Sequence, residues 1–137
     1  MPAHILQIDD NAADIELLRT ALEESDWDVR FTGLDDVAKG RSYLMEQAGL
    51  KSLPNLILVD QSLAGEGADS LFAWLGEHEL AVPHRIVFTS GTSQRRRTDL
   101  ERSGATAVFI KPTLYDDLVA VTVPKLRELI DRDTVHG

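Results

Sequence analysis

Five short apolar runs recur along the chain, and four of them end in reactive polar side chains. The runs are predicted strands, and they cover residues 4–8, 27–32, 55–60, 84–89 and 106–110. Amphipathic stretches separate them, and this alternation predicts a parallel sheet with helices on both faces. The carboxyl ends of parallel strands meet at one edge, where open α/β sheets bind their ligands. We therefore expect the polar strand ends to form one site.

The stretches between these runs have the apolar spacing of helices that pack through one stripe. The apolar positions of the five predicted helices fall within residues 15–22, 34–48, 68–75, 93–103 and 114–132. Asn11 can cap the first helix, whose first turn is predicted to contain the acids Asp14 and Glu16. Gly49 and Gly76 are predicted to end the second and third helices. Pro124 lies inside the last helix, whose apolar stripe keeps its phase, so a kink is expected rather than two separate helices.

The fourth predicted helix, SQRRRTDLERS, contains only one large apolar residue, Leu100. Helices in proteins owe most of their stability to a packed apolar face, so we expect this helix to be held loosely. Its arginine run, Arg95–Arg97, is interpreted as a solvated helix face, and the less favoured interpretation is a patch that binds a partner.

Composition narrows the classes of function. The length of 137 residues and the apolar share of 43% fit one globular domain over residues 1–137. A net charge of −9 argues against direct binding of nucleic acid, and the absence of cysteine excludes disulfides and thiol chemistry. No apolar run approaches the roughly 20 residues of a membrane helix. The first residues lack a signal-peptide pattern, so we expect a soluble, cytoplasmic protein.

The polar strand ends supply the groups of a phosphoryl-acceptor site. They are Asp9, Asp10, Asp60, Thr89, Ser90 and Lys111. Unit charges about 5 Å apart repel by roughly 3 kcal/mol at an effective dielectric constant near 20, so the carboxylates need a neutralising cation. Mg²⁺ fits, because it takes oxygen ligands and often binds one or two carboxylates together with a phosphate. Asp60 would be the nucleophile, while Mg²⁺ and Lys111 would offset charge on the phosphoryl oxygens.

These four strand-end motifs, in this order and at this spacing, resemble the receiver domain of bacterial response regulators of the chemotaxis-regulator type, over essentially the whole chain. The resemblance implies a flavodoxin-like, doubly wound (βα)5 fold with five parallel strands in the order 2-1-3-4-5. It implies two-component signal transduction, in which a sensor histidine kinase or a phosphotransfer protein phosphorylates Asp60 and thereby switches protein–protein interactions. No enzymatic activity is implied beyond self-phosphorylation and slow autodephosphorylation.

The resemblance also implies the ligands of the metal ion. Asp10 and Asp60 would bind Mg²⁺ directly, the main-chain carbonyl of Ser62 would add a ligand, and Asp9 would act mostly through water. The output partner is a protein that the sequence does not name. A homodimer through the fourth and fifth helices is compatible with the sequence but not required by it.

The phosphoryl group itself would be bound by the ends of the last two strands. In the family pattern Thr89 is the switch hydroxyl, Ser90 lies beside it, and Lys111 pairs with the phosphoryl group. The Lys111–Pro112 peptide bond is expected to be cis, which costs an X–Pro bond only about 0.5–1 kcal/mol.

Several positions depart from the family pattern. Val108 stands where the family usually has a tyrosine or phenylalanine that acts as a rotamer switch, and Phe109 is expected to point to the opposite face of the strand. The loop 64–68 has Ala64 in place of the usual proline and is rich in glycine. These departures concern the aromatic part of the switch and the loop that follows the acceptor.

In the family, the residues two positions after the acceptor and two positions after the threonine tend to set the rate of autodephosphorylation. Here they are Ser62 and Gly91. Neither side chain has a carboxylate or an amide to orient an attacking water, so slow autodephosphorylation is expected. An alternative function is a degenerate receiver that binds partners without phosphorylation, although the intact acids and Lys111 oppose it. A haloacid-dehalogenase-type phosphatase would need a second aspartate where Ser62 stands.

Overall fold

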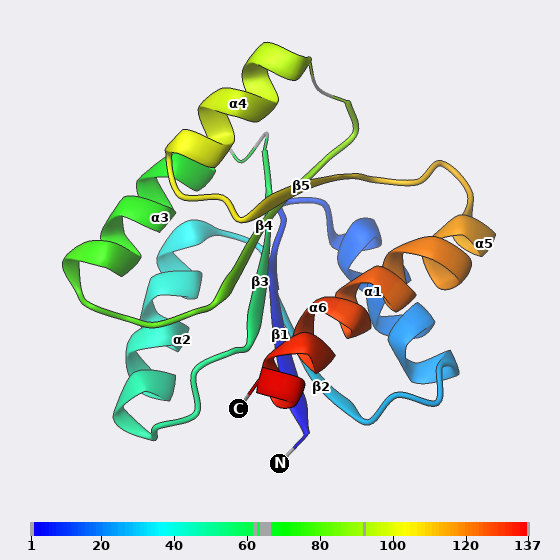
Figure 1. Ribbon diagram of the computed structural model, residues 1–137, viewed down its shortest axis with the longest axis horizontal. Helices are drawn as coiled ribbons and strands as arrows, with labels where there is room; N and C mark the ends of the chain where they lie inside the picture. The colour runs from blue at the N-terminus through cyan, green and yellow to red at the C-terminus, as the bar shows by residue number, and fades with distance from the viewer. Residues whose placement is uncertain (1, 62, 64–66, 92, 137) are drawn as a thin grey trace.

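A five-stranded parallel sheet forms the centre of the molecule (Figure 1). The computed structural model describes residues 2–61, 63, 67–91 and 93–136, with side chains up to residue 132. The strands are β1 Ala3–Ile8, β2 Val29–Leu34, β3 Leu56–Asp60, β4 His84–Thr89 and β5 Ala107–Ile110. They lie in the order β2-β1-β3-β4-β5, and every neighbouring pair is parallel. The predicted flavodoxin-like, doubly wound α/β fold is therefore confirmed.

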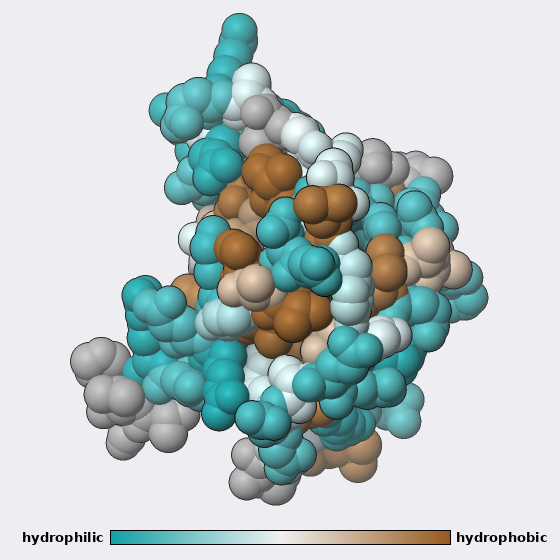
Figure 2. Space-filling model, turned by 90° about the vertical axis from the view of Figure 1, so that its right-hand side faces the viewer, coloured by the Kyte–Doolittle hydropathy of each residue, from teal (hydrophilic) through white to brown (hydrophobic). Residues whose placement is uncertain are grey.

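Helices cover both faces of this sheet (Figure 1). On one face lie α2 Val37–Gly49, α3 Ala68–Glu77 and α4 Gln94–Arg102, and on the other lie α1 Ala12–Glu24, α5 Tyr115–Asp117 and α6 Val123–His136. Figure 2 views the side that carries α1, α5 and α6, where apolar side chains gather near the centre and polar ones surround them. Within the described part of the chain, no helix has the length and apolar character needed to cross a membrane.

The apolar run Leu56–Val59 of the central strand β3 follows from this double cover. In β3, Ile57 and Val59 pack beneath α2 and α3, whereas Leu56 and Leu58 pack against α1 and α6. Successive side chains of a strand point to opposite faces, so a strand covered on both faces is apolar at most of its positions. Alternate positions of one strand thus anchor two separate cores.

Several boundaries differ from those predicted. The second strand begins at Val29 and includes Leu34, which we had assigned to the second helix. The helix begins only at Val37, because the side chain of Asp36 accepts a hydrogen bond from the Lys39 N–H and so caps it. Gly76 does not end the third helix, which continues to Glu77.

The last helix stays helical through its proline, but not as a simple kinked α-helix. Pro124 lacks an N–H, and in a regular α-helix its ring would crowd the carbonyl of Ala120. The turn before it is instead π-helical, and the Val123 N–H bonds the carbonyl of Leu118, five residues earlier. The last helical region therefore consists of α5, the π-helical segment Leu118–Thr122 and α6 in succession. Residues on both sides of the proline still pack into the same core.

Helix α4 is attached to the body mainly by one apolar side chain. Leu100 is its buried residue, as the sequence suggested. Ser93 caps the helix by accepting a hydrogen bond from the Arg96 N–H, and the Arg97 guanidinium donates to the main-chain oxygen of Val108 at 3.4 Å. The loose attachment of this helix remains a prediction.

Candidate functional site

Three carboxylates meet at the carboxyl edge of the sheet. Asp9 and Asp10 directly follow β1, and Asp60 ends the neighbouring strand β3. An oxygen from each of the three carboxylates lies within 4.8 Å of the others. Asp9 and Asp60 are buried, while Asp10 is exposed. Carboxylate oxygens are the ligands that a hard divalent cation prefers, and the exposed side leaves room for water and phosphate, so the three residues could bind such an ion.

Lys111 reaches this cluster from the end of β5. Its ammonium nitrogen lies 2.8 Å from an oxygen of Asp9, 2.8 Å from an oxygen of Asp14 and 3.4 Å from an oxygen of Asp60. The main-chain N–H of Lys111 donates to the carbonyl of Thr89, which fixes the base of the side chain. The sequence pointed to Asp60 as the partner of this lysine, but it identified Asp14 only as an acid in a helix's first turn.

Hydrogen bonds occupy both oxygens of Asp9. Its Oδ1 accepts from the Asn11 N–H at 2.9 Å, and its Oδ2 accepts from Lys111 and, at 3.5 Å, from the Gln7 amide. Burial raises the pKa of Asp9 and outweighs the hydrogen bonds from Lys111 and Asn11, which lower it. Burial alone would lower the pKa of Lys111, but its hydrogen bonds to Asp14 and Asp9 raise that pKa well above the usual range. The ammonium therefore stays charged at neutral pH.

Thr89 ends β4 with its hydroxyl bonded to its own chain. Its side-chain Oγ1 donates to the carbonyl of Gly91 at 2.9 Å and accepts from the Gly91 N–H at 3.3 Å. The side chain is buried, whereas the following Ser90 is exposed. To contact a phosphoryl group, the hydroxyl of Thr89 would have to exchange the carbonyl of Gly91 for a phosphoryl oxygen.

Val108, at the position where the sequence resemblance implies an aromatic switch, is buried beneath α4, in the same core as Leu100. Phe109 packs against the opposite core, which confirms the predicted direction of its side chain. No aromatic ring is therefore available at position 108 to follow the movement of a hydroxyl at Thr89.

One expectation about the site is wrong, and others fall outside the described residues. Among the residues that the structure describes, no peptide bond is cis, so the bond between Lys111 and Pro112 is trans. The two isomers of an X–Pro bond differ by only about 0.5–1 kcal/mol, so a family tendency is easily overridden by local contacts. Ser62 and residues 64–66, which carry the predicted carbonyl ligand and most of the altered loop, lie outside the described residues.

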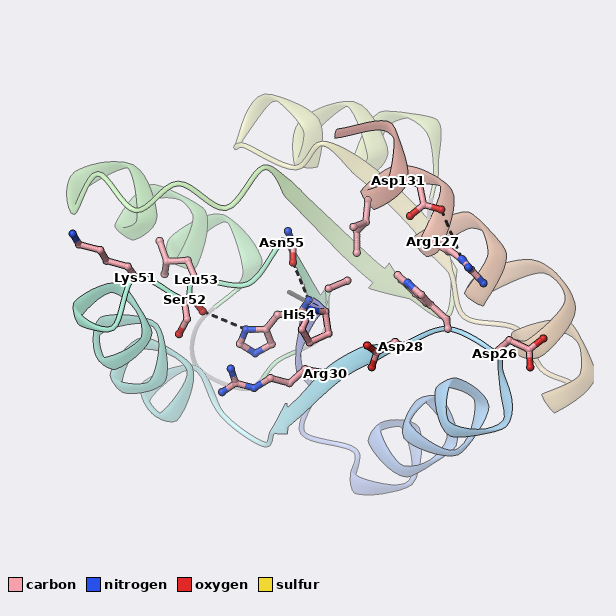
Figure 3. Close-up of a pocket in the computed structure, with 14 residues that line it drawn as sticks. His4, Asp26, Asp28, Arg30, Lys51, Ser52, Leu53, Asn55, Arg127 and Asp131 are labelled. Carbon is pink, nitrogen blue, oxygen red and sulfur yellow. Dashed lines mark hydrogen bonds and ion pairs between the residues drawn. The ribbon is translucent and has the colours of Figure 1, made fainter. Parts of the chain in front are cut away.

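A hollow of about 820 Å³ lies at the opposite, amino-terminal edge of the sheet (Figure 3). Its charged lining mixes cations and anions: Arg30, Lys51, Arg127, Asp26, Asp28 and Asp131. His4 is buried below it, and its two ring nitrogens lie 2.7 Å from the Tyr43 hydroxyl and 3.4 Å from the Ser52 carbonyl. This mixture favours no ligand class, so we assign the functional site to the acidic edge.

Comparison with known proteins bears on the fold. No family model and no curated protein matches the sequence. The Mn²⁺-bound form of response regulator Rcp1 is 23% identical, with 87% of this chain and 88% of that chain covered and a TM-score of 0.71. The phosphorylated cyanobacterial phytochrome response regulator RcpA is 20% identical, with 88% and 89% covered and a TM-score of 0.75.

A response-regulator receiver domain protein (CheY-like) from Methanospirillum hungatei JF-1 is similar over the full length of both chains. The identity is 21%, the covered shares are 100% and 100%, and the TM-score is 0.75. The chain thus has the fold of a single response-regulator receiver domain, as its strand-end motifs predicted. In this fold, the carboxylates of Asp9, Asp10 and Asp60 form an acidic pocket. The side-chain ammonium of Lys111 forms ion pairs with Asp9 and Asp60 in it.

Proposed function

We propose that the chain acts as one receiver domain in two-component signal transduction and accepts a phosphoryl group on Asp60. The observation that supports this proposal is the convergence of Asp60 with Asp9 and Asp10 within 4.8 Å, with the ammonium of Lys111 3.4 Å from Asp60. The donor is a phosphohistidine of a sensor histidine kinase or of a phosphotransfer protein. A carboxylate oxygen of Asp60 attacks the phosphorus, an O–P bond forms, and the N–P bond breaks as the imidazole leaves with the electron pair.

The donor set fits Mg²⁺ as the cofactor. Asp10 and Asp60 would bind it directly, Asp9 would act mostly through water, and the main-chain carbonyl of Ser62 would add a ligand. When bound, the ion supplies positive charge that faces the phosphoryl oxygens. The similar regulator Rcp1 was solved with Mn²⁺, and this supports a divalent cation at the present pocket.

Lys111 and Thr89 bind the transferred group in this proposal. The ammonium of Lys111 pairs with a phosphoryl oxygen, and the hydroxyl of Thr89 leaves the carbonyl of Gly91 to donate to another. This exchange of partners shifts the ends of β4 and β5, and the shift changes the affinity for a downstream protein. Because Val108 is aliphatic, the switch runs without the rotation of an aromatic ring.

A titration with beryllofluoride, which mimics the phosphoryl group, separates this proposal from a degenerate receiver. With Mg²⁺ present, the wild-type protein should show a saturable change in its amide NMR spectrum around residues 89–91. The Asp60→Asn variant should show none. A wild-type protein without any saturable change would contradict the proposal and favour a module that binds partners without phosphorylation.

A further inference from the structure

Lys111 is held between two carboxylates that come from different elements. Asp9 belongs to the end of β1, whereas Asp14 lies in the first turn of α1, and each has an oxygen 2.8 Å from the ammonium nitrogen. The acceptor Asp60 is the more distant partner at 3.4 Å. The resting lysine is thus bound more closely by two acids that do not accept the phosphoryl group than by the one proposed to do so.

The start of α1 places Asp14 at this position. The side chain of Asn11 accepts a hydrogen bond from the Ala13 N–H at 3.0 Å, and the Asp14 N–H donates to the main-chain oxygen of Asn11 at 3.1 Å. The cap therefore fixes the first turn against the edge of the sheet. The side chain of Asp14 is 27% exposed and that of Lys111 is 15% exposed, so water screens this pair less than it screens a surface pair.

An acid in a first turn also favours the helix dipole, but that role needs no contact with a lysine. Glu16 shows the difference. It lies two residues further along α1, is 66% exposed and pairs with Arg19 at 3.2 Å. Asp14 differs from it in pointing its carboxylate into the pocket and in bonding Lys111.

We propose that Asp14 is a positioning residue that draws the ammonium of Lys111 toward α1 in the resting protein, so that its contact with Asp60 is the longest of its three ion pairs. This inference rests on the proposed function, because it concerns how readily the same pocket takes up a phosphoryl group. Lys111 must give up at least one short bond to reach that group, and the negative charge of Asp14 repels the phosphoryl oxygens. Both effects lower the affinity of the resting site for the anion.

The test compares Asp14→Asn with the matched control Glu16→Gln, which removes the same charge two residues further along the same helix. Calorimetry measures the affinity for Mg²⁺ alone and for beryllofluoride at saturating Mg²⁺. Asp14→Asn should bind beryllofluoride about tenfold more tightly than wild type, as expected for one lost charge-assisted bond. Its affinity for Mg²⁺ should fall about two- to threefold, because a nearby negative charge is gone.

These opposite shifts separate positioning from a structural role, since a damaged fold would weaken both affinities. The Glu16→Gln control should leave both affinities unchanged. Equal or weaker beryllofluoride binding by Asp14→Asn would overturn the inference. Should that variant fail to fold, as judged by thermal melting, Asp14→Ala is measured in its place with the same expectation.

A crystal structure of the metal-free variant gives a readout that does not depend on phosphorylation. In Asp14→Asn, the Lys111 nitrogen should move closer to Asp60 than the present 3.4 Å. An unmoved lysine would overturn the inference while leaving the proposed function intact. A wild-type protein that fails to bind beryllofluoride would instead overturn the proposed function, and the position of the lysine would still test the effect of Asp14.

Discussion

Replacement of Asp10 by asparagine should stabilise the metal-free protein and strongly reduce the stabilisation by Mg²⁺. Asp10 is the suitable target within the acidic cluster because it is exposed. Its repulsion with Asp9 and Asp60 therefore follows from Coulomb's law at a dielectric constant close to that of water. Asp9 is less suitable, since it accepts hydrogen bonds from Asn11 and Lys111 that an asparagine would weaken.

The size of the effect follows from the geometry of the cluster. One oxygen from each of the three carboxylates lies within 4.8 Å of an oxygen of the other two. Two unit charges at about this distance repel by about 1 kcal/mol in water and about 3 kcal/mol at an effective dielectric constant of 20. The exposed position of Asp10 favours the lower figure for its pairs with Asp9 and Asp60, and the charge of Lys111 offsets part of it. We expect Asp10→Asn to stabilise the metal-free protein by about 1 kcal/mol, which raises Tm by about 3–5 °C.

The assay is thermal melting in a metal chelator and again with excess Mg²⁺. Mg²⁺ at a hundred times its Kd should stabilise the wild-type fold by about 2.7 kcal/mol. The variant should gain much less, because it has lost a direct ligand. Asp26→Asn removes an exposed charge from the opposite end of the sheet and serves as the control. If Asp10→Asn melted like this control without metal, or gained as much from Mg²⁺ as wild type, the account of clustered acids would be refuted.

Three further predictions concern other parts of the molecule. Burial lowers the pKa of His4 from its ordinary value of 6.5, assisted by the charge of Arg30. The stability that depends on neutral His4 should therefore be complete above pH 6.5 and be lost as the pH falls through the lowered pKa. Urea unfolding between pH 7.5 and 5 should show this loss, and His4→Gln should show less of it; an equal loss in both would contradict the assignment. Amides of α4 should exchange with deuterium faster than those of β4, because Leu100 is the one buried side chain of the helix; equal protection would contradict its loose attachment. Phosphorylated Asp60 should persist for minutes or longer, since Ser62 and Gly91 cannot orient a water, and a lifetime of seconds would count against this reasoning.

The sequence was sufficient to predict the fold and the members of the acidic pocket. Asp9 and Asp60 follow apolar runs that must be strands buried on both faces, and the topology of a doubly wound sheet makes those strands neighbours. Lys111 ends the last strand, and its long side chain spans the remaining distance. These features depend on chain order and strand direction, which a sequence records directly.

Features that depend on side-chain direction or on competition between local geometries could not be predicted in the same way. Asp14 was recognised as an acid in a first turn, but its bond to Lys111 depends on the angle at which α1 meets the sheet. Pro124 predicts an irregular helix. The choice between a kink and a π-helical turn depends on which carbonyls the neighbouring N–H groups can bond. The isomer of the Lys111–Pro112 bond depends on a small energy difference that no motif reveals.

The most direct test of the account is the intact mass of the protein after incubation with acetyl phosphate and Mg²⁺. Wild type should gain one phosphoryl group, fragment analysis should locate it on Asp60, and Asp60→Asn should gain none. A wild-type mass that stays unchanged, or a phosphoryl group that appears equally on Asp60→Asn, would contradict the assignment of the acidic edge as a phosphoryl-acceptor site.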